Sequence, residues 1–408
     1  METLGEEKST TSMVVNRSSK KPKISELPID VIDGILSRLP VKSILQCKSV
    51  SKPWLSRISD PLFTKLYFTR STADHRTALF ISAYDSSTHK RHFLSAAHDG
   101  GPVTHLMTLD NPNYIHFSDP VHLNGLVFFT CTNWAYGKYN QYVLNPTTRK
   151  TFELPHPASL TDRGHGPHCY LFGFDESRNE HKILMVRRLL FPPKVDIMIF
   201  SMINYSWRKT DCECPVAFRW CTLYRDIYGS VCVNSVVYVM LRGSVDILAF
   251  DFRTEKFSMI GTLPGFVPRE LTTSYTLDGK PLYNGNKAVL IKINGCIGVV
   301  CHDNVLLSNE MHIWRLQDYE NCVWVREVIT LPKPCVELDH PYPLNVSNMD
   351  EIIFSSGKVS GNVICLPIYN KKSKRCKVLR FTLGDGFLSP ETVEFKQIKC
   401  YAESIMPL

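Results

Sequence analysis

The chain has 408 residues and a net charge of +8, and 44% of its residues are hydrophobic against 21% charged, values that are typical of a folded protein. No run reaches the roughly 18 to 20 consecutive apolar residues of a bilayer span, and the first residues lack the apolar stretch of a secretory signal. We therefore expect a protein with no membrane partner, located in the nucleus, the cytoplasm or both.

Basic residues gather near both ends of the chain, and the 14 cysteines are scattered along it. Residues 1–24 are predicted to be a disordered basic tail, and residues 371–380 a solvated hairpin tip. A nucleic-acid surface is the alternative, but no aromatic residues that would stack on bases are interleaved with the basic ones, so we expect no nucleic-acid partner. The cysteines lack the paired spacing of zinc modules and are expected to be reduced core residues. No metal and no cofactor are predicted.

Residues 25–68 have the pattern of short helices. Between Leu27 and Pro40, apolar residues recur at the spacing of one helical face. Further helices are predicted from Val41 and from Ser51, and a last turn from Asp60. A module of about 45 residues is close to the size at which a single core is marginal, yet this one carries more large apolar side chains than its own interior can hide. We therefore expect a partner helix bundle to cover the remainder.

Several patterns in this module resemble the F-box: Leu27-Pro28, Ile35-Leu36-x-x-Leu39-Pro40, Val41-Lys42-Ser43 and Val50-Ser51-Lys52-x-Trp54. The resemblance implies docking onto a Skp-type linker protein, and through it an indirect association with a cullin. It also implies a set of linker-protein contacts, which are Leu27, Pro28, Ile32, Ile35, Leu36, Leu39, Pro40, Val41, Leu45, Val50 and Trp54. The alternative is that several of these residues only pack the module against itself or against the following domain.

After Phe68 the chain changes to short apolar or alternating runs bounded by turn residues, which predicts an all-β region. A weak repeat of strand, polar turn and strand returns roughly every 50 to 70 residues, near the length of a propeller blade. Six units are predicted, and the strand candidate from Glu391 to Cys400 would close the ring against the first unit. A stacked β-sandwich is the alternative. The equivalent points of the repeat are Phe93, Phe152, Trp207, Phe257, Trp324 and Val378.

The same region resembles the F-box-associated domain of plant F-box proteins, in stretches such as HLNGLVFF from His122, NPTTRKTFELP from Asn145 and FDFRTEKFSMI from Phe250. This resemblance implies that the domain binds an unknown substrate protein. The predicted fold class is an α+β multidomain protein, in which a small all-α F-box precedes an all-β, propeller-like domain of about six blades. The predicted boundaries are 25–68 for the F-box, 69–90 for a linker and first strand, and 91–408 for the propeller-like domain.

The segment RGHGPHC contains His165, His168 and Cys169, and we interpret it as a polar loop between blades rather than a metal or nucleophile site. No catalytic residue is predicted. The predicted function is that of a non-catalytic, substrate-recognition subunit of a Skp–cullin–F-box ubiquitin ligase. Two alternatives stay open: an F-box scaffold that acts without a cullin, and a propeller enzyme.

Overall fold

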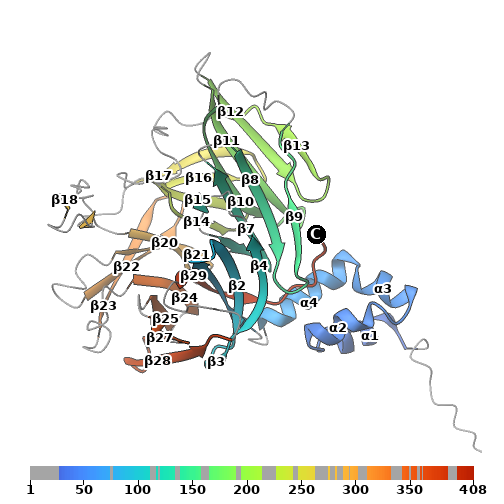
Figure 1. The fold of residues 1–408 in the computed structure, drawn as a ribbon. Coiled ribbons are helices and arrows are strands. Elements are labelled where there is room, and N and C mark those ends of the chain that lie inside the picture. The colour runs from blue at the N-terminus through green and yellow to red at the C-terminus, as the bar shows by residue number, and fades with distance from the viewer. Residues whose placement is uncertain are drawn as a thin grey trace, which may run out of the picture.

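Figure 1 shows a short helical module attached to one side of a larger body made of twisted sheets. The computed structural model describes residues 27–408 except for eighteen segments. These are 74–76, 111–115, 118–119, 134–137, 158–164, 190–193, 214–226, 242–246, 262–273, 276–280, 283–287, 294, 302–309, 332–341, 349–350, 356–358, 361 and 385–392.

The helical module contains α1 (Ile29–Leu36), α2 (Val41–Cys47), α3 (Lys52–Ile58) and α4 (Pro61–Ala73). The helices begin at residues suited to a first turn: Pro28 and Pro40 precede α1 and α2, and the Ser51 hydroxyl accepts a hydrogen bond from the Trp54 amide at 3.4 Å. The short helices predicted from the sequence are confirmed. The last one is longer than the predicted single turn, because α4 continues to Ala73.

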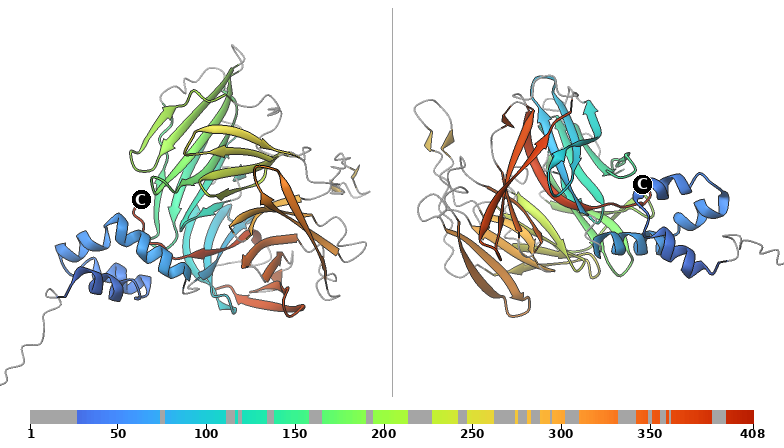
Figure 2. Two further views of the ribbon diagram at one scale, coloured as in Figure 1. Left: turned by 180° about the vertical axis from the view of Figure 1, so that it is seen from behind. Right: turned by 90° about the horizontal axis from the view of Figure 1, so that it is seen from below.

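Six sheets of four or more strands surround the centre of the larger body as the blades of a propeller (Figures 1 and 2). Blade 1 contains, in sheet order, β29 (Val393–Ala402), β1 (Thr77–Asp85), β2 (Lys90–Ala96) and β4 (Thr104–Asp110). Blade 2 contains β5 (His116–Phe117) and β6 (Val121–Leu123), which both pair with β7 (Leu126–Asn133), followed by β8 (Lys138–Asn145) and β9 (Lys150–Glu153). Blade 3 contains β10 (His165–Asp175), β11 (Glu180–Leu189), β12 (Lys194–Ser201) and β13 (Ser206–Lys209).

Blades 4 to 6 follow the same plan. Blade 4 contains β14 (Ile227–Val233), β15 (Val236–Leu241), β16 (Ile247–Asp251) and β17 (Lys256–Ile260). Blade 5 contains β20 (Ala288–Ile293), β21 (Cys296–Cys301), β22 (Glu310–Asp318) and β23 (Val323–Thr330). Blade 6 contains β24 (Tyr342–Asn348), β25 (Glu351–Ser355), β26 (Val359–Ser360), β27 (Val363–Asn370) and β28 (Arg375–Thr382), and β3 (Gly101–Pro102) pairs with β28. A separate two-stranded sheet pairs β18 (Ser274–Tyr275) with β19 (Pro281–Leu282).

The ring closes by antiparallel pairing of β29 with β1, so a strand from the end of the chain completes blade 1. The predicted six-unit fold and the predicted closing strand are therefore confirmed. One detail of the repeat was wrong. Phe152, Trp207, Phe257 and Trp324 lie on the outermost strand of their blades, and Val378 lies on β28, outside which only the short β3 pairs. Phe93 instead lies on β2, one strand further in, where it pairs with Met107 of β4.

Neighbouring blades share their hydrophobic cores. Because side chains alternate along a strand, adjacent residues of one blade face different neighbours. In β7, Phe128 packs into the core between blades 2 and 3, and Phe129 packs into the core between blades 1 and 2. Six such clusters follow one another around the ring. The apolar faces of each blade are thus buried by the neighbouring blades on both sides, which explains why closure of the ring matters.

The tight hairpins have one recurring turn. Its first residue has a short polar side chain that accepts a hydrogen bond from a backbone amide two or three residues later, for example Asp85 from Ser87 at 2.9 Å and Asn370 from Ser373 at 2.9 Å. The fifth residue has a positive φ. These turns begin at Asp85, Asn145, Asp175, Ser201, Asp251, Asp318 and Asn370.

Candidate protein-interaction site

The four helices of the N-terminal module pack around a small core. Phe63 and Tyr67 lie one helical turn apart on α4 and are almost fully buried, together with Ile44 of α2 and Ile58 of α3. The Tyr67 hydroxyl donates a hydrogen bond to the Leu39 carbonyl at 3.2 Å. One further member of this core, Ile405, comes from the other end of the chain.

Salt bridges and hydrogen bonds fix the helices relative to one another. The buried Asp33 carboxylate of α1 accepts hydrogen bonds from two nitrogens of Arg57 in α3, Nε at 2.7 Å and Nη2. The hydrogen bond to Asp33 raises the pKa of the Arg57 guanidinium. Arg70 of α4 donates to the Gly34 carbonyl at 3.2 Å and to the Ser37 hydroxyl at 2.6 Å. These contacts fix the helices relative to one another, and they involve none of the module's exposed apolar side chains.

Large apolar side chains remain exposed along this module. Val50 is 70% exposed and Leu62 75% exposed, and an exposed group of large apolar side chains is typical of an interaction surface. Leu62 and Leu66 lie on α4 beside the buried Phe63 and Tyr67, so the four residues divide between two faces rather than sharing one side of a helix. The exposed apolar residues of the module are Ile29, Val31, Ile35, Val50, Leu55, Leu62 and Leu66.

The structure places the predicted contact residues in three environments. Exposed are Pro28, Ile35, Pro40 and Val50; half-buried are Leu27, Ile32, Leu39, Val41, Leu45 and Trp54. Leu36 is different, because it is 2% exposed and belongs to the module's own core. The helical periodicity shows that Leu36 lies on an apolar face, but the packing of α1 turns this side chain inward. A contact role for the other predicted residues stays a prediction.

Five exposed apolar residues were absent from the predicted contact set: Ile29, Val31, Leu55, Leu62 and Leu66. A signal for some of them was present in the sequence. Val31 lies four residues before Ile35, and Leu62 lies four residues before Leu66, so each pair occupies one face of a helix. None of the five residues belongs to the motifs that resemble the F-box, so the resemblance does not identify them.

The segment from His165 to Cys169 is not the predicted loop, because it forms the first part of β10. Cys169 is buried in the core between blades 3 and 4. Ten described cysteines are reduced, as expected, whereas Cys376 is disulfide-bonded, a pairing that sequence spacing does not reveal. Within the described part of the chain, no three His, Cys, Asp or Glu residues lie close enough to hold a metal ion. None of the helices described is both long and apolar enough to span a bilayer.

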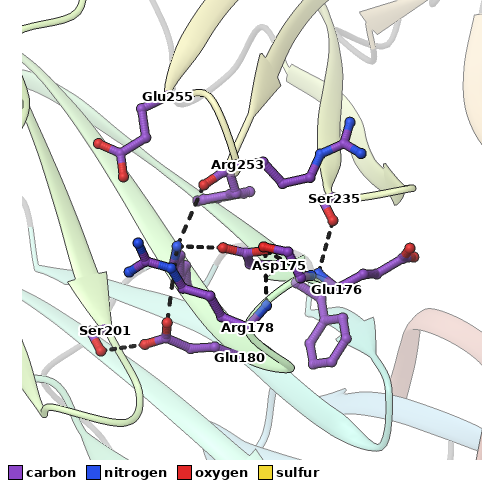
Figure 3. A network of polar contacts seen from close by, with 12 residues as sticks. Asp175, Glu176, Arg178, Glu180, Ser201, Ser235, Arg253 and Glu255 are labelled. Carbon is purple, nitrogen blue, oxygen red and sulfur yellow. Dashed lines mark hydrogen bonds and ion pairs between the residues drawn. The ribbon is translucent and has the colours of Figure 1, made fainter.

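A buried polar network in the propeller lies between blades 3 and 4 (Figure 3). Lys182 is almost fully buried, and its Nζ donates to the Asp175 carboxylate at 2.7 Å and to the Phe252 carbonyl at 3.4 Å. The Glu180 carboxylate lies 4.0 Å from the same nitrogen and accepts a hydrogen bond from the Ser201 hydroxyl. Lys182, Asp175 and Glu180 thus each have a partner within the network. The network joins blade 3 to blade 4 through the hydrogen bond from Lys182 to the Phe252 carbonyl.

Known protein families match both parts of the chain. The F-box domain matches residues 24–66, and the F-box associated beta propeller domain matches residues 65–399. The chain is 28% identical over 323 residues to F-box protein At5g65850 of Arabidopsis thaliana, covering 77% of this chain and 73% of the relative. It is 27% identical over 364 residues to F-box protein DOR of the same plant, and this match covers 84% of this chain and 82% of the relative.

Proposed function

The chain belongs to the F-box proteins that carry an F-box-associated β-propeller, and from this premise we propose that it is the substrate-recognition subunit of a Skp–cullin–F-box ubiquitin ligase. The F-box would bind a Skp-type linker protein, which in turn would join it to a cullin. The propeller would bind the protein to be ubiquitinated. We place this activity in the nucleus, the cytoplasm or both.

One observation carries the proposal, and it is the exposed apolar surface of the F-box. Hydrophobic surface is stabilising only when it is removed from water, at about 25 cal/mol per Å². The F-box is too small to bury Ile35, Val50 and Leu62 itself, and the propeller does not cover them. A helical partner that packs on these side chains would gain that free energy, with most of it concentrated in a few residues.

The proposed role needs no catalytic residue in this chain. Holding a target lysine near the thioester of a conjugating enzyme turns an encounter in solution into a reaction within one assembly, which raises the effective concentration of the reactants. The chain would therefore act as a non-catalytic adaptor, and it would speed ubiquitin transfer only by positioning the target lysine near the thioester.

The F-box surface can be tested with a matched pair of substitutions in the full chain. Ile35 in the F-box and Val378 on the outer strand of blade 6 are both 50% exposed. We expect Ile35→Asp to weaken binding of a purified Skp-type linker protein at least tenfold, and Val378→Asp to leave it unchanged. Leu36 is unsuitable for this purpose, since a carboxylate in the core would unfold the module.

Binding is measured by calorimetry, and the fold of each variant by circular dichroism. If Ile35→Asp binds the linker protein as tightly as the parent chain, the proposed contact surface is wrong. Co-purification of a cullin with the parent chain from cells, and its loss with Ile35→Asp, would separate a ligase subunit from an F-box scaffold that acts without a cullin.

A further inference from the structure

The end of the described chain lies between the F-box and the propeller. After β29, residues 403–408 run past α4 and along the side of the ring, and Figures 1 and 2 show the C-terminus next to the helices in every view. Ser404 is fully buried and Ile405 is 1% exposed. The segment is therefore packed on both sides, by two domains that are distant from it in sequence.

Consecutive side chains of this segment enter two different cores. Ile405 belongs to the F-box core, with Leu36, Phe63 and Tyr67. Met406 packs against the core between blades 2 and 3. The F-box core is thus incomplete without a residue that follows the last strand of the propeller, and the same segment is anchored to the propeller one residue later.

Polar contacts hold the segment to blade 2. The side-chain amide of Asn145 donates hydrogen bonds to the carbonyl of Ser404 at 3.1 Å and to that of Met406 at 2.8 Å. The Ser404 amide donates to the Thr147 hydroxyl at 3.1 Å. Asn145 itself is fully buried, and its side-chain oxygen keeps the usual role in the hairpin turn by accepting from the Thr147 amide at 2.9 Å.

Asparagine is required at this turn for a reason that the other turns lack. Aspartate occupies the same position at Asp85, Asp175, Asp251 and Asp318, and it makes the same turn hydrogen bond. A carboxylate, however, has no N–H to donate to the two carbonyls of the segment. Asn145 therefore performs two tasks, and only one of them belongs to the propeller fold.

Gly125, in the turn before β7, makes room for the segment. Its φ is +83°, and a Cβ atom placed there would lie 2.1 Å from the Cβ of Ser404. Any other residue would displace residues 403–408 from blade 2. Two neighbouring turns of blade 2 are thus adapted to receive this segment, one by a donor and one by the absence of a side chain.

We propose that residues 403–408 are a strap that holds the F-box in one orientation on the propeller, with Ile405 and Asn145 as its positioning residues. Only three residues, 74–76, connect α4 to β1 along the chain. The strap adds a second attachment between the F-box and the propeller. Because Ile405 is buried in the F-box core and Met406 packs against a core of the propeller, the strap would resist rotation of the F-box relative to the propeller. If the chain has the function proposed above, the strap sets where a bound target lies relative to the rest of the ligase. The proposal also means that the F-box core is complete only when the propeller ring is closed.

The strap is tested in the full chain with Asn145→Asp and, as a control, Asn370→Asp at the equivalent turn of blade 6, where the Asn370 side chain accepts from the Ser373 amide. Both variants keep the turn hydrogen bond. Fluorophores are introduced as unnatural amino acids at Lys65 in the F-box and Lys256 in blade 4, both exposed, and the distance distribution is measured by single-molecule energy transfer. We expect a single narrow distribution for the parent chain and Asn370→Asp, and a broad one for Asn145→Asp. Equal widths in all three would overturn the proposal.

A second variant tests the shared core. Ile405→Ala is expected to raise the Kd for the Skp-type linker protein about tenfold, because a smaller fraction of chains has a formed F-box. Ile405→Leu should restore binding, and Ile203→Ala, at an exposed isoleucine of blade 3, should not change it. Unchanged affinity for Ile405→Ala would refute the dependence of the F-box on the strap. If the parent chain binds no linker protein, the proposed ligase role fails, while the distance distributions still decide whether the strap holds the domains together.

Discussion

Thr77, the first residue of β1, is paired with Ala402, the last residue of β29. The pairing continues along both strands to Asp85 and Val393, so one antiparallel pair closes the ring. β1 begins four positions after the last residue of α4, and residues 403–408 follow β29 directly. The orientation of the F-box therefore depends on the same strands that complete blade 1.

Removing residues 391–408 is expected to open the ring. Blade 1 would lose β29, and the core that it shares with blade 6 would lose Val393 and Ile398. Because each blade is stabilised by its neighbours, we expect the cooperative thermal transition to be lost. A synthetic peptide of residues 391–408 should restore the transition when it is added to the shortened chain. A shortened chain that melts at the temperature of the parent would show that closure contributes little, and a chain without residues 1–16 serves as a control of similar length.

Breaking the buried ion pair between Asp175 and Lys182 should destabilise the propeller. Burial opposes ionisation of Asp175, but hydrogen bonds from Lys182 and Ser177 outweigh it and hold the pKa of this carboxyl below its usual value. Asp175→Asn keeps the turn, since Asn145 and Asn370 occupy the same position elsewhere, and it leaves the Lys182 charge buried without its closest partner. We expect a loss of about 3 to 5 kcal/mol in the free energy of unfolding, measured by urea denaturation.

The matched control for this ion pair is Asp318→Asn at the equivalent turn of blade 5, where the accepting groups are exposed. We expect its effect on the free energy of unfolding to stay within about 0.5 kcal/mol. Similar losses for Asp175→Asn and Asp318→Asn would assign the effect to the turn rather than to the buried lysine.

Two histidines, the buried His181 and the half-buried His122, should make the protein less stable as the pH falls. Burial lowers the pKa of His181 to about 4 and that of His122 to about 3. His181 stacks on Phe172, and its Nε2 lies 3.1 Å from the Leu123 carbonyl oxygen. Below the ordinary histidine pKa of about 6.5, the unfolded chain binds protons that the folded chain does not, so stability is present above that pH and is lost as the pH falls.

Between about pH 6.5 and pH 4, we expect each histidine to lower the free energy of unfolding by about 1.4 kcal/mol for each pH unit that the pH falls. Urea denaturation at several pH values measures it. His181→Gln should halve the slope, because only His122 then contributes. A free energy of unfolding that stays constant across this range would contradict the assignment of neutral imidazoles at both positions.

Much of the architecture could be predicted from local patterns. The spacing of Ile32 and Leu36 predicted a helix, and the polar turns predicted the hairpins, because helical periodicity and turn chemistry are encoded within a few residues. The closed ring was predicted from the number of repeats and from an additional strand near Glu391 that was left over after the last repeat. The first repeat was placed one strand too far in, at Phe93, because the connection from β2 to β4 is longer than a tight turn and leaves no recognisable second strand.

The candidate site was harder to predict, because burial is decided by packing between distant segments. Leu36 and Ile35 are adjacent and similar in chemistry, yet one is in the core and the other is exposed. The strap had no signal at all in the sequence. Ile405 follows a strand like any other apolar residue, and only the folded chain shows that it lies beside Phe63, more than three hundred positions away in the sequence.

Gly173 of β10 allows blade 4 to pack closely on blade 3. A Cβ atom at this position would lie 2.0 Å from Cε2 of Phe252, a ring that is 1% exposed and packs edge-on against Phe250. Gly173→Ala should therefore push Phe252 out of the shared core and reduce the free energy of unfolding by about 1 to 3 kcal/mol. Gly261→Ala is the control, because nothing lies within 4 Å of a Cβ atom there. Urea midpoints measure both variants, and adding Phe252→Leu to Gly173→Ala should recover part of the loss by making room for the methyl group. Equal midpoints for Gly173→Ala and Gly261→Ala would show that the two blades can move apart without cost.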